Sequence, residues 1–166
     1  LDNDGVEITF GRYTYFDMDD DGFLEQTSWA GADDGFLVLD LNADGSRGSG
    51  DGLIDQTNEL ILSSWGNAGD SDLQALGRAF DDNNDGVINA QDAVWSELHV
   101  WQDLDQDGVT DAGELHSMSD LVISQINVTY DDGSAFNDTT NDVTGFGNTL
   151  QGLASYTRNG SVVTGG

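Results

Sequence analysis

Two twelve-residue segments, 81–92 and 103–114, carry oxygen-bearing residues at fixed positions around a central glycine. The first reads DDNNDGVINAQD and the second reads DLDQDGVTDAGE. In the EF-hand loop register, positions 1, 3, 5, 7, 9 and 12 supply oxygen ligands, and a glycine at position 6 makes the sharp turn. Calcium is a hard cation that takes six to eight such oxygens. The register therefore predicts two calcium sites.

The predicted ligands are Asp81, Asn83, Asp85, Val87, Asn89 and Asp92 in the first loop, and Asp103, Asp105, Asp107, Val109, Asp111 and Glu114 in the second. Val87 and Val109 stand at position 7, where the main-chain carbonyl is the donor.

Apolar spacing predicts the elements that hold these two loops. Leu73, Leu76 and Phe80 follow an i, i+3, i+7 spacing, which predicts a short helix leading into the first loop. Val94, Leu98 and Trp101 form an i, i+4, i+7 stripe, so a single helix over 90–101 is expected between the loops. A further helix is expected to begin at 114–118. Two loops that share one short helix are more compact than a calmodulin-like pair, so we expect no groove-opening sensor.

A third loop begins at Asp17. Asp17, Asp19, Asp21 and Gly22 occupy positions 1, 3, 5 and 6, and Phe23 offers its carbonyl at position 7. Position 12 is Ser28, which cannot supply a bidentate carboxylate. Either this loop binds calcium more weakly, or a carboxylate arrives from elsewhere, with Asp33 and Asp34 the nearest candidates.

A fourth loop follows a short apolar strand over 36–39, and two registers fit it. One register uses Asp40, Asn42, Asp44 and Gly45. The other treats 43–50 as an insertion and takes its ligands as Asp40, Asn42, Asp51, Leu53, Asp55 and Glu59, with Gly52 at the turn. We favour the second register because it ends on a carboxylate, as the 103–114 loop does.

The residue patterns at both ends of the chain predict mainly β-strands. Asp2 and Asp4 fit positions 3 and 5 of a further, incomplete calcium loop, and Val6, Ile8 and Phe10 alternate with polar residues. Val122, Ile126, Val128 and Tyr130 predict a half-buried strand, and Asn159-Gly160 predicts a type I′ hairpin. Residues 131–148 are polar and acidic. The fold class is therefore predicted as α+β: calcium loops and short helices packed on a small antiparallel sheet.

The composition agrees with metal as part of the fold. The chain has 32 acidic and four basic residues, giving a formal charge of −28. Such a charge repels nucleic acid and anionic membrane surfaces. Four or more bound Ca²⁺ ions would remove roughly 8 to 10 negative charges. At 166 residues, the length predicts a single calcium-binding domain over 1–166, which reads as a piece of a larger multidomain protein.

The chain contains no cysteine and no proline. Calcium sites of this density need roughly millimolar calcium, which places them outside the cell. Without disulfides, this pattern fits bacterial export and a cell-surface location. No apolar run approaches the ~20 residues of a membrane-spanning helix, so membrane insertion is not expected.

Six stretches of the chain, taken in order, resemble the self-processing module of bacterial RTX proteins. They are LDNDGVE, FDMDDDG, WAGADDGFLVLDLN, GLIDQTNEL, WQDLDQDGVTDAGEL and NTLQGLASYT. The resemblance implies that calcium folds the module, which then cleaves an Asp-Pro bond just before its own N-terminus. It also implies that the aspartate side chain attacks its own carbonyl and gives an anhydride that a lysine amine can capture.

The chain departs from that pattern because it has no proline or lysine and carries insertions near 43–50 and 131–148. It also resembles the calcium-dependent peptide-binding domains of large RTX adhesins, which hold a peptide's free C-terminal carboxylate on a bound calcium. From this second resemblance we expect a monomeric, non-enzymatic module that binds a peptide or protein ligand, with Asp33 and Asp34 near the ligand. The alternatives are a self-processing module with its cleavage site upstream of Leu1, or a purely structural spacer made rigid by calcium.

Overall fold

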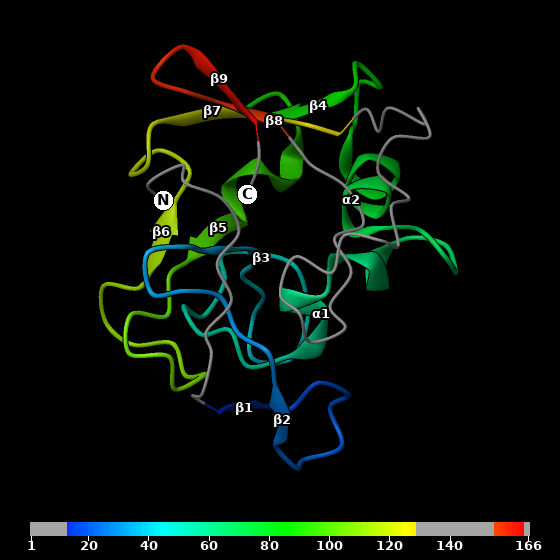
Figure 1. Ribbon diagram of the computed structural model, residues 1–166. Coiled ribbons are helices and arrows are strands. Elements are labelled where there is room, and N and C mark those ends of the chain that lie inside the picture. The colour runs from blue at the N-terminus through cyan, green and yellow to red at the C-terminus, as the bar shows by residue number, and fades with distance from the viewer. Residues whose placement is uncertain (1–12, 129–154, 165–166) are drawn as a thin grey trace, which may run out of the picture.

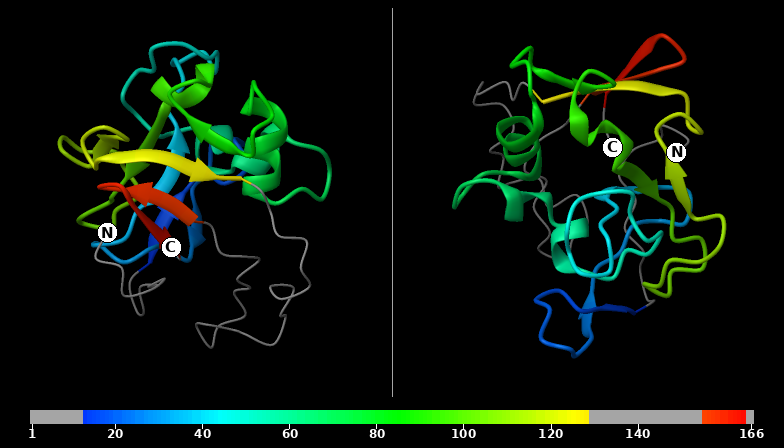
Figure 2. Two further views of the ribbon diagram at one scale, coloured as in Figure 1. Left: turned by 90° about the horizontal axis from the view of Figure 1, so that it is seen from above. Right: turned by 180° about the vertical axis from the view of Figure 1, so that it is seen from behind.

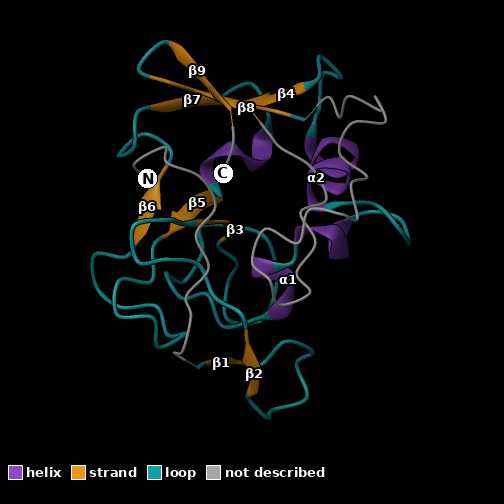
Figure 3. Ribbon diagram, in the orientation of Figure 1, coloured by secondary structure: helices purple, strands orange, loops and turns teal. Residues whose placement is uncertain are grey.

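The computed structural model describes residues 13–128 and 155–164 of the chain. In chain order its elements are strands β1 (Thr14–Phe16), β2 (Glu25–Thr27) and β3 (Phe36–Leu39), helix α1 (Thr57–Leu60), 3₁₀ helix η1 (Leu62–Trp65), helix α2 (Asp72–Phe80), strand β4 (Val87–Asn89), 3₁₀ helix η2 (Ala93–Ser96), and strands β5 (Leu98–Trp101), β6 (Leu115–Ser117), β7 (Ile123–Asn127), β8 (Ser155–Arg158) and β9 (Ser161–Thr164). The strands form three small antiparallel sheets, β1-β2, β3-β5-β6 and β4-β7-β8-β9. The expected α+β class is confirmed in part: short helices and antiparallel strands are present, but strands predominate and form three small sheets rather than one (Figure 3).

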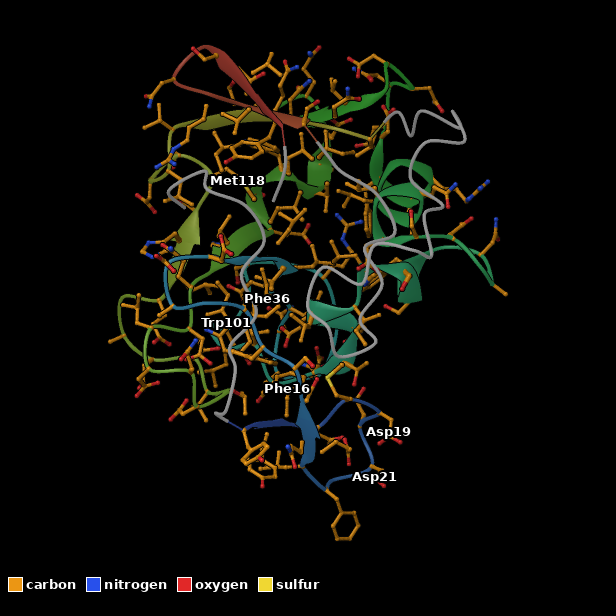
Figure 4. All side chains as sticks on the ribbon, in the orientation of Figure 1. Phe16, Asp19, Asp21, Phe36, Trp101 and Met118 are labelled. Carbon is orange, nitrogen blue, oxygen red and sulfur yellow. The ribbon has the colours of Figure 1, made fainter. Side chains whose placement is uncertain are left out.

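The three-stranded sheet separates two hydrophobic cores. One face of β5 turns Leu98 and Val100 toward a core that also holds Leu39. The other face turns Trp101 toward a second core that holds Val38. Because successive strand side chains point to opposite faces, a strand covered on both sides is apolar almost throughout. Met118 and Trp101, labelled in Figure 4, lie on opposite sides of this sheet.

The first core lies between the central sheet, α2 and the four-stranded sheet. Its fully buried members include Leu76 of α2 and Ile88 of β4. The second core is mainly aromatic and consists of Phe16, Trp29, Val38, Ile54 and Trp101. In Figure 1 and the right panel of Figure 2, the four-stranded sheet stands at one end of the molecule and the β1-β2 hairpin at the other.

Helix α2 confirms the helix predicted before the 81–92 loop. Its start is fixed by a reciprocal cap, in which Ser71 Oγ accepts from Gln74 N (3.3 Å) and Gln74 Oε1 accepts from Ser71 N (2.9 Å). Its apolar face buries Leu76 and Phe80 in the first core. The helix ends at Phe80, so the first loop residue, Asp81, follows directly.

The chain between the two EF-hand-like loops is not the single helix predicted over 90–101. It forms η2 over one turn and then strand β5, which pairs with β3 and β6. Likewise β6 replaces the helix expected at 114–118. A spacing of three or four residues between apolar side chains cannot identify a helix when both faces of a strand are buried. Here Leu98 and Trp101 belong to different cores.

The C-terminal strands agree with the sequence except at Val122. The predicted hairpin is present as β8-β9, and Asn159 and Gly160 both have positive φ (52° and 74°), as a type I′ turn requires. Ile126 and Val128 are buried, but Val122 is 54% exposed and Ile123 is buried instead. An irregularity in the β7-β8 pairing between residues 123 and 125 shifts the alternation. The predicted strand at 6–10, Tyr130 and residues 131–148 lie outside the described residues.

Truncation of Leu76 tests the first core. Leu76 is fully buried, so Leu76→Ala should reduce the free energy of unfolding by about 2–5 kcal/mol, through lost apolar burial and the cavity left behind. Leu104→Ala is the matched control, because Leu104 is 56% exposed and its truncation should cost less than about 0.5 kcal/mol. Urea unfolding with calcium present would measure both, and equal losses would contradict this description of the core.

Candidate metal-binding site

The 103–114 loop folds around the carboxylate of its first residue. Asp103 accepts hydrogen bonds from the backbone N–H groups of Asp107 (3.2 Å) and Gly108 (2.8 Å). Asp107 in turn accepts from the N–H of Val109 at 2.8 Å. Gly108 has φ of +80°, a left-handed conformation that glycine adopts without strain. These contacts bring the side chains of positions 1 and 5 to the inside of one turn.

The last carboxylate closes the same loop. Glu114 accepts from the N–H of Leu104 at position 2 (2.8 Å) and from the N–H of Asp111 at position 9 (2.9 Å). Asp103 and Glu114 are each only 3% exposed. Two acidic side chains are therefore taken out of water side by side, and within the described residues neither forms an ion pair with a basic side chain.

The 81–92 loop repeats this hydrogen-bond scheme. Asp81 accepts from the N–H groups at loop positions 5 and 6 (3.2 and 2.9 Å), and Asp92 accepts from those at positions 2 and 9 (both 2.9 Å). Asn83 adds its own contact, since its amide nitrogen donates to Asp85 at 2.9 Å. Asp92 is buried (3% exposed).

The loop over 40–59 follows the register with an insertion. Asp40 accepts from the N–H groups of Asp51 and Gly52, both at 3.1 Å, and these two residues hold positions 5 and 6 in that register. Glu59 accepts from the N–H of Leu41 and from that of Asp55, both at 2.9 Å. Residues 43–50 leave this scheme undisturbed. Glu59 is completely buried within the short helix α1.

The Asp17 loop is closed by a residue that the sequence reasoning missed. Asp17 accepts from the N–H groups at positions 5 and 6 (3.1 and 2.8 Å), as in the other loops. The N–H of Met18, at position 2, donates to Glu25 at 2.9 Å. Glu25 stands at position 9 and begins β2, where it pairs with Phe16. Its carboxylate therefore occupies the place that position 12 fills elsewhere. The sequence signal that could have identified Glu25 is an acidic residue at loop position 9, at the start of the second strand of a hairpin.

Three groups of carboxylates in the described part of the chain could each hold a metal ion. They are Asp17, Asp19 and Glu25; Asp103, Asp105 and Glu114; and Asp105, Asp107 and Asp111, and within each group the oxygen atoms lie within 4.8 Å of one another. The loops at 81–92 and 40–59, which use asparagine at some ligand positions, form no such three-carboxylate group among the described residues. Figure 4 shows Asp19 and Asp21 on the outer β1-β2 loop.

Burial affects the protonation of two of these acids. Desolvation raises the pKa of Glu59 above its ordinary value, and the N–H groups that the carboxylate accepts from only partly oppose this. Desolvation also raises the pKa of Asp103, against hydrogen bonds from Gly108 N, Gln106 N and the Trp29 indole. Burial thus makes the ionised forms of these two carboxylates costly, and a bound cation would offset that cost.

The segment over 29–35 is fastened to the 103–114 loop. The Trp29 indole N–H donates to Asp103 at 2.7 Å, and the Gln106 side chain donates to the carbonyl of Ala30 at 3.0 Å. The Gln102 side chain donates to the carbonyl of Asp33 at 3.0 Å. Gln102 and Gln106, which are not proposed ligands, thus fix the position of the 29–35 segment.

Asp33 and Asp34 do not supply the carboxylate that the Asp17 loop was expected to borrow. Glu25 supplies it, and neither aspartate belongs to any of the three carboxylate groups of the described residues. Asp34 is buried (8% exposed), and its N–H donates to the carbonyl of Gly31 at 3.1 Å. Contact of this pair with a ligand stays a prediction. Asp2 and Asp4 lie outside the described residues.

Acidic loops built by one hydrogen-bond scheme and carried on small antiparallel sheets define a class of domain that can hold hard cations. A family model described as the SPM domain matches residues 1–164. The chain belongs to this family of self-processing modules, as its sequence resemblance predicted. It is 37% identical over 161 residues to the iron-regulated protein FrpA of Neisseria meningitidis serogroup C. The match covers 95% of this chain but only 14% of that relative.

The family match favours the self-processing alternative over the peptide-binding adhesin that we expected first. In the described ranges 13–128 and 155–164, no helix is long and apolar enough to cross a membrane. The extracellular location and the absence of nucleic-acid partners stay predictions.

The position-6 glycines give a matched pair of mutations. Gly108→Ala would place a Cβ 2.5 Å from the carbonyl oxygen of Tyr15, whereas Gly22→Ala meets nothing within 4 Å. Both residues have positive φ, so each substitution should cost about 1 kcal/mol of backbone strain. We expect Gly108→Ala to lower the melting temperature clearly more than Gly22→Ala, because β1 must also move. Equal melting temperatures would contradict the close approach of β1 to this loop.

The raised pKa values predict an unusual pH dependence for metal-free protein. The stability that Glu59 and Asp103 contribute is fully present below their ordinary values of 4.5 and 3.8, and it is lost as pH rises through the raised folded values. Asp70 has the opposite effect on stability. Its hydrogen bond from Arg78 lowers its pKa, so the stability that Asp70 contributes is lost as pH falls below 3.8.

In chelator, the free energy of unfolding should therefore rise as pH falls from about 7 to about 4, and decline below that. With calcium added, protons compete with the ion and acidification should destabilise the protein over the same range. Thermal melts across pH, with and without chelator, would measure both trends. A steady loss of stability on acidifying the metal-free protein would contradict the raised pKa values.

Proposed function

We propose that this chain is a calcium-dependent self-processing module. Calcium orders its loops, and the ordered domain promotes cleavage of an Asp-Pro bond that precedes it in a longer protein. The observation that carries the proposal is the hydrogen-bond scheme common to four loops of a chain in the SPM family. In every loop, backbone N–H groups turn the first carboxylate inward and tie the closing carboxylate to position 2.

Calcium is the cation that best suits these loops. The donors are carboxylate, amide and carbonyl oxygens, which hard cations prefer, and the loops are long enough for six or more ligands. Magnesium demands a smaller octahedral shell and keeps its waters. Four calcium ions would cut the formal charge of −28 by about eight.

The proposed ligands fall into four sets. They are Asp17, Asp19, Asp21, Phe23 and Glu25; Asp40, Asn42, Asp51, Leu53, Asp55 and Glu59; Asp81, Asn83, Asp85, Val87, Asn89 and Asp92; and Asp103, Asp105, Asp107, Val109, Asp111 and Glu114. Glu25 is the one addition to the sequence-based prediction. Asp2 and Asp4 would belong to a further loop near the N-terminus.

The cleavage itself needs no external oxidant or cofactor. A side-chain oxygen of the aspartate attacks its own carbonyl carbon, the C–N bond to proline breaks, and the proline nitrogen takes up a proton. The product is a cyclic anhydride, which water opens to a free C-terminal aspartate. A lysine amine could open it instead and form an isopeptide bond, but this chain has no lysine, so the amine would come from another part or another chain.

Capture of a peptide's free C-terminus is the competing function. It was motivated by a loop with no carboxylate at position 12, which would leave a calcium ion open to an incoming carboxylate. Glu25 now supplies an acidic ligand to that loop, so this motivation is weaker. The same experiment can test both functions.

The test uses the chain extended at its N-terminus by natural upstream sequence, or by a short segment that ends in Asp-Pro. Adding calcium should release the upstream fragment on a gel within hours, and circular dichroism should show folding over the same calcium range. Magnesium at equal concentration should do neither. Asp→Asn at the cleavage position is the matched control, because it replaces the attacking carboxylate with a neutral amide, which cannot form the anhydride, and leaves the loops intact. Folding without cleavage, together with calcium-dependent binding of free but not amidated peptide C-termini, would favour peptide capture. No response to calcium would reject both functions.

A further inference from the structure

The loops starting at Asp17, Asp40 and Asp103 are joined by hydrogen bonds between loops. The backbone N–H of Thr57, in the second of these loops, donates to the Asp20 side chain of the first at 3.0 Å. The Thr57 hydroxyl also donates to the carbonyl of Asp17 at 3.3 Å. Each of these contacts needs both loops in their folded shape, because one partner in each is a loop backbone group.

The third loop is joined to the other two in the same way. The N–H of Ile54, inside the 40–59 loop, donates to the Thr110 hydroxyl at 2.9 Å. The hydroxyl of Thr14, in the strand that leads to Asp17, donates to the carbonyl of Gln106 at 2.9 Å. Thr14 is 2% exposed, so this bond is shielded from water.

The aromatic core fills the space between these three loops. Phe16 directly precedes Asp17, Ile54 lies between two proposed ligands, and Trp101 stands two residues before Asp103. The rings of Trp29 and Trp101 meet edge to face with centroids 5.4 Å apart, and Trp29 holds Asp103 through its indole N–H. An ion that orders one loop therefore also fixes side chains that the other loops pack against.

The 81–92 loop stands apart from this unit. It follows α2 and contains β4, and both its own residue Ile88 and the flanking Phe80 and Val94 belong to the other core. The insertion of the 40–59 loop reaches toward it through Arg47, which pairs with Glu97 at 2.9 Å and lies over the Phe80 ring at 4.8 Å. Glu97 stands after η2, outside the 81–92 loop, so this pair does not join the two ion-binding loops directly.

We propose that the loops 17–28, 40–59 and 103–114 bind calcium as one cooperative unit, while the 81–92 loop binds its ion separately. The inference rests on the proposed calcium-binding function and adds its regulation. The first ion orders backbone that the neighbouring loops require, so the next ions bind to a protein that has already lost that freedom. The unit would then respond to calcium over a narrow concentration range.

Tryptophan fluorescence can follow the cooperative unit on its own. Trp29 and Trp101 lie in the aromatic core of the unit, whereas Trp65 and Trp95 pack against the other core. In a variant that carries both Trp65→Phe and Trp95→Phe, the tryptophan emission therefore comes from Trp29 and Trp101 of the unit. Calcium titration of this variant should give one steep transition with a Hill coefficient above 1, to a limit of about 3, the number of coupled loops. Calorimetry should show a separate phase for the fourth loop, which Asp81→Asn removes.

Two substitutions at loop residues that are not themselves proposed ligands test the coupling. Thr110→Val leaves the Ile54 N–H without its acceptor, and Asp20→Gly removes the acceptor of Thr57 N while tolerating the positive φ at that position (56°). Each should lower the Hill coefficient toward 1 and weaken calcium binding in the fluorescence transition about fivefold, as expected for one lost hydrogen bond. Thr27→Val is the matched control, since its recorded hydroxyl contact is with the adjacent Ser28 carbonyl, and it should leave the titration unchanged.

The outcomes separate the two proposals. Calcium binding with a Hill coefficient of 1, or with unchanged steepness in both variants, would overturn the cooperative unit and leave the proposed function standing. A protein that binds no calcium by calorimetry would overturn both. Asp20 lies on the surface, so Asp20→Gly keeps the test valid if Thr110→Val fails to fold.

Discussion

Electrostatic repulsion between carboxylates is the constraint on which the rest of this structure depends. In the 103–114 loop, Asp103 and Glu114 are nearly inaccessible to water and have oxygens within 4.8 Å of each other. At an effective dielectric constant of about 20, two unit charges at that separation repel by about 3.5 kcal/mol. Backbone N–H groups offset part of this cost, and a divalent cation would offset much more. The strands between the loops have only three to five residues, so they provide few ladder bonds against it.

The two cores give these loops their fixed positions. β5 runs through the centre of the molecule, covered on both faces, and delivers Trp101 two residues before the first acid of the 103–114 loop. On the other side of that loop, β6 returns directly to pair with β5. The loop is thus held at both ends by one strand pair. A loop anchored in this way can bring acids together without a helix on either side, unlike the helix–loop–helix arrangement that the ligand spacing alone indicates.

The sequence predicts the structure best where the loop residues lie close together in the chain. It predicts the structure least well where contacts between distant residues determine the conformation. Both continuous loops, and the 40–59 register with its insertion, could be predicted because glycine at the turn and acids at fixed positions act within a few residues. Glu25 was missed because its role follows from the β1-β2 pairing rather than from loop numbering. The strand at 98–101 was mistaken for a helix because the apolar spacing of Val94, Leu98 and Trp101 carries no sign that a second core lies beneath the sheet.

The contacts between loops also show how calcium could control a reaction at a distance from its binding sites. β1 follows the N-terminal segment, and it is held against the 103–114 loop by the Thr14 hydroxyl and by the close approach of Gly108 to the Tyr15 carbonyl. If a cation orders that loop, it also fixes the position of β1. An aspartate that attacks its own carbonyl gains rate chiefly from being held in the reactive conformation. Under the proposed function, the ions would therefore act by ordering the domain, without touching the scissile bond.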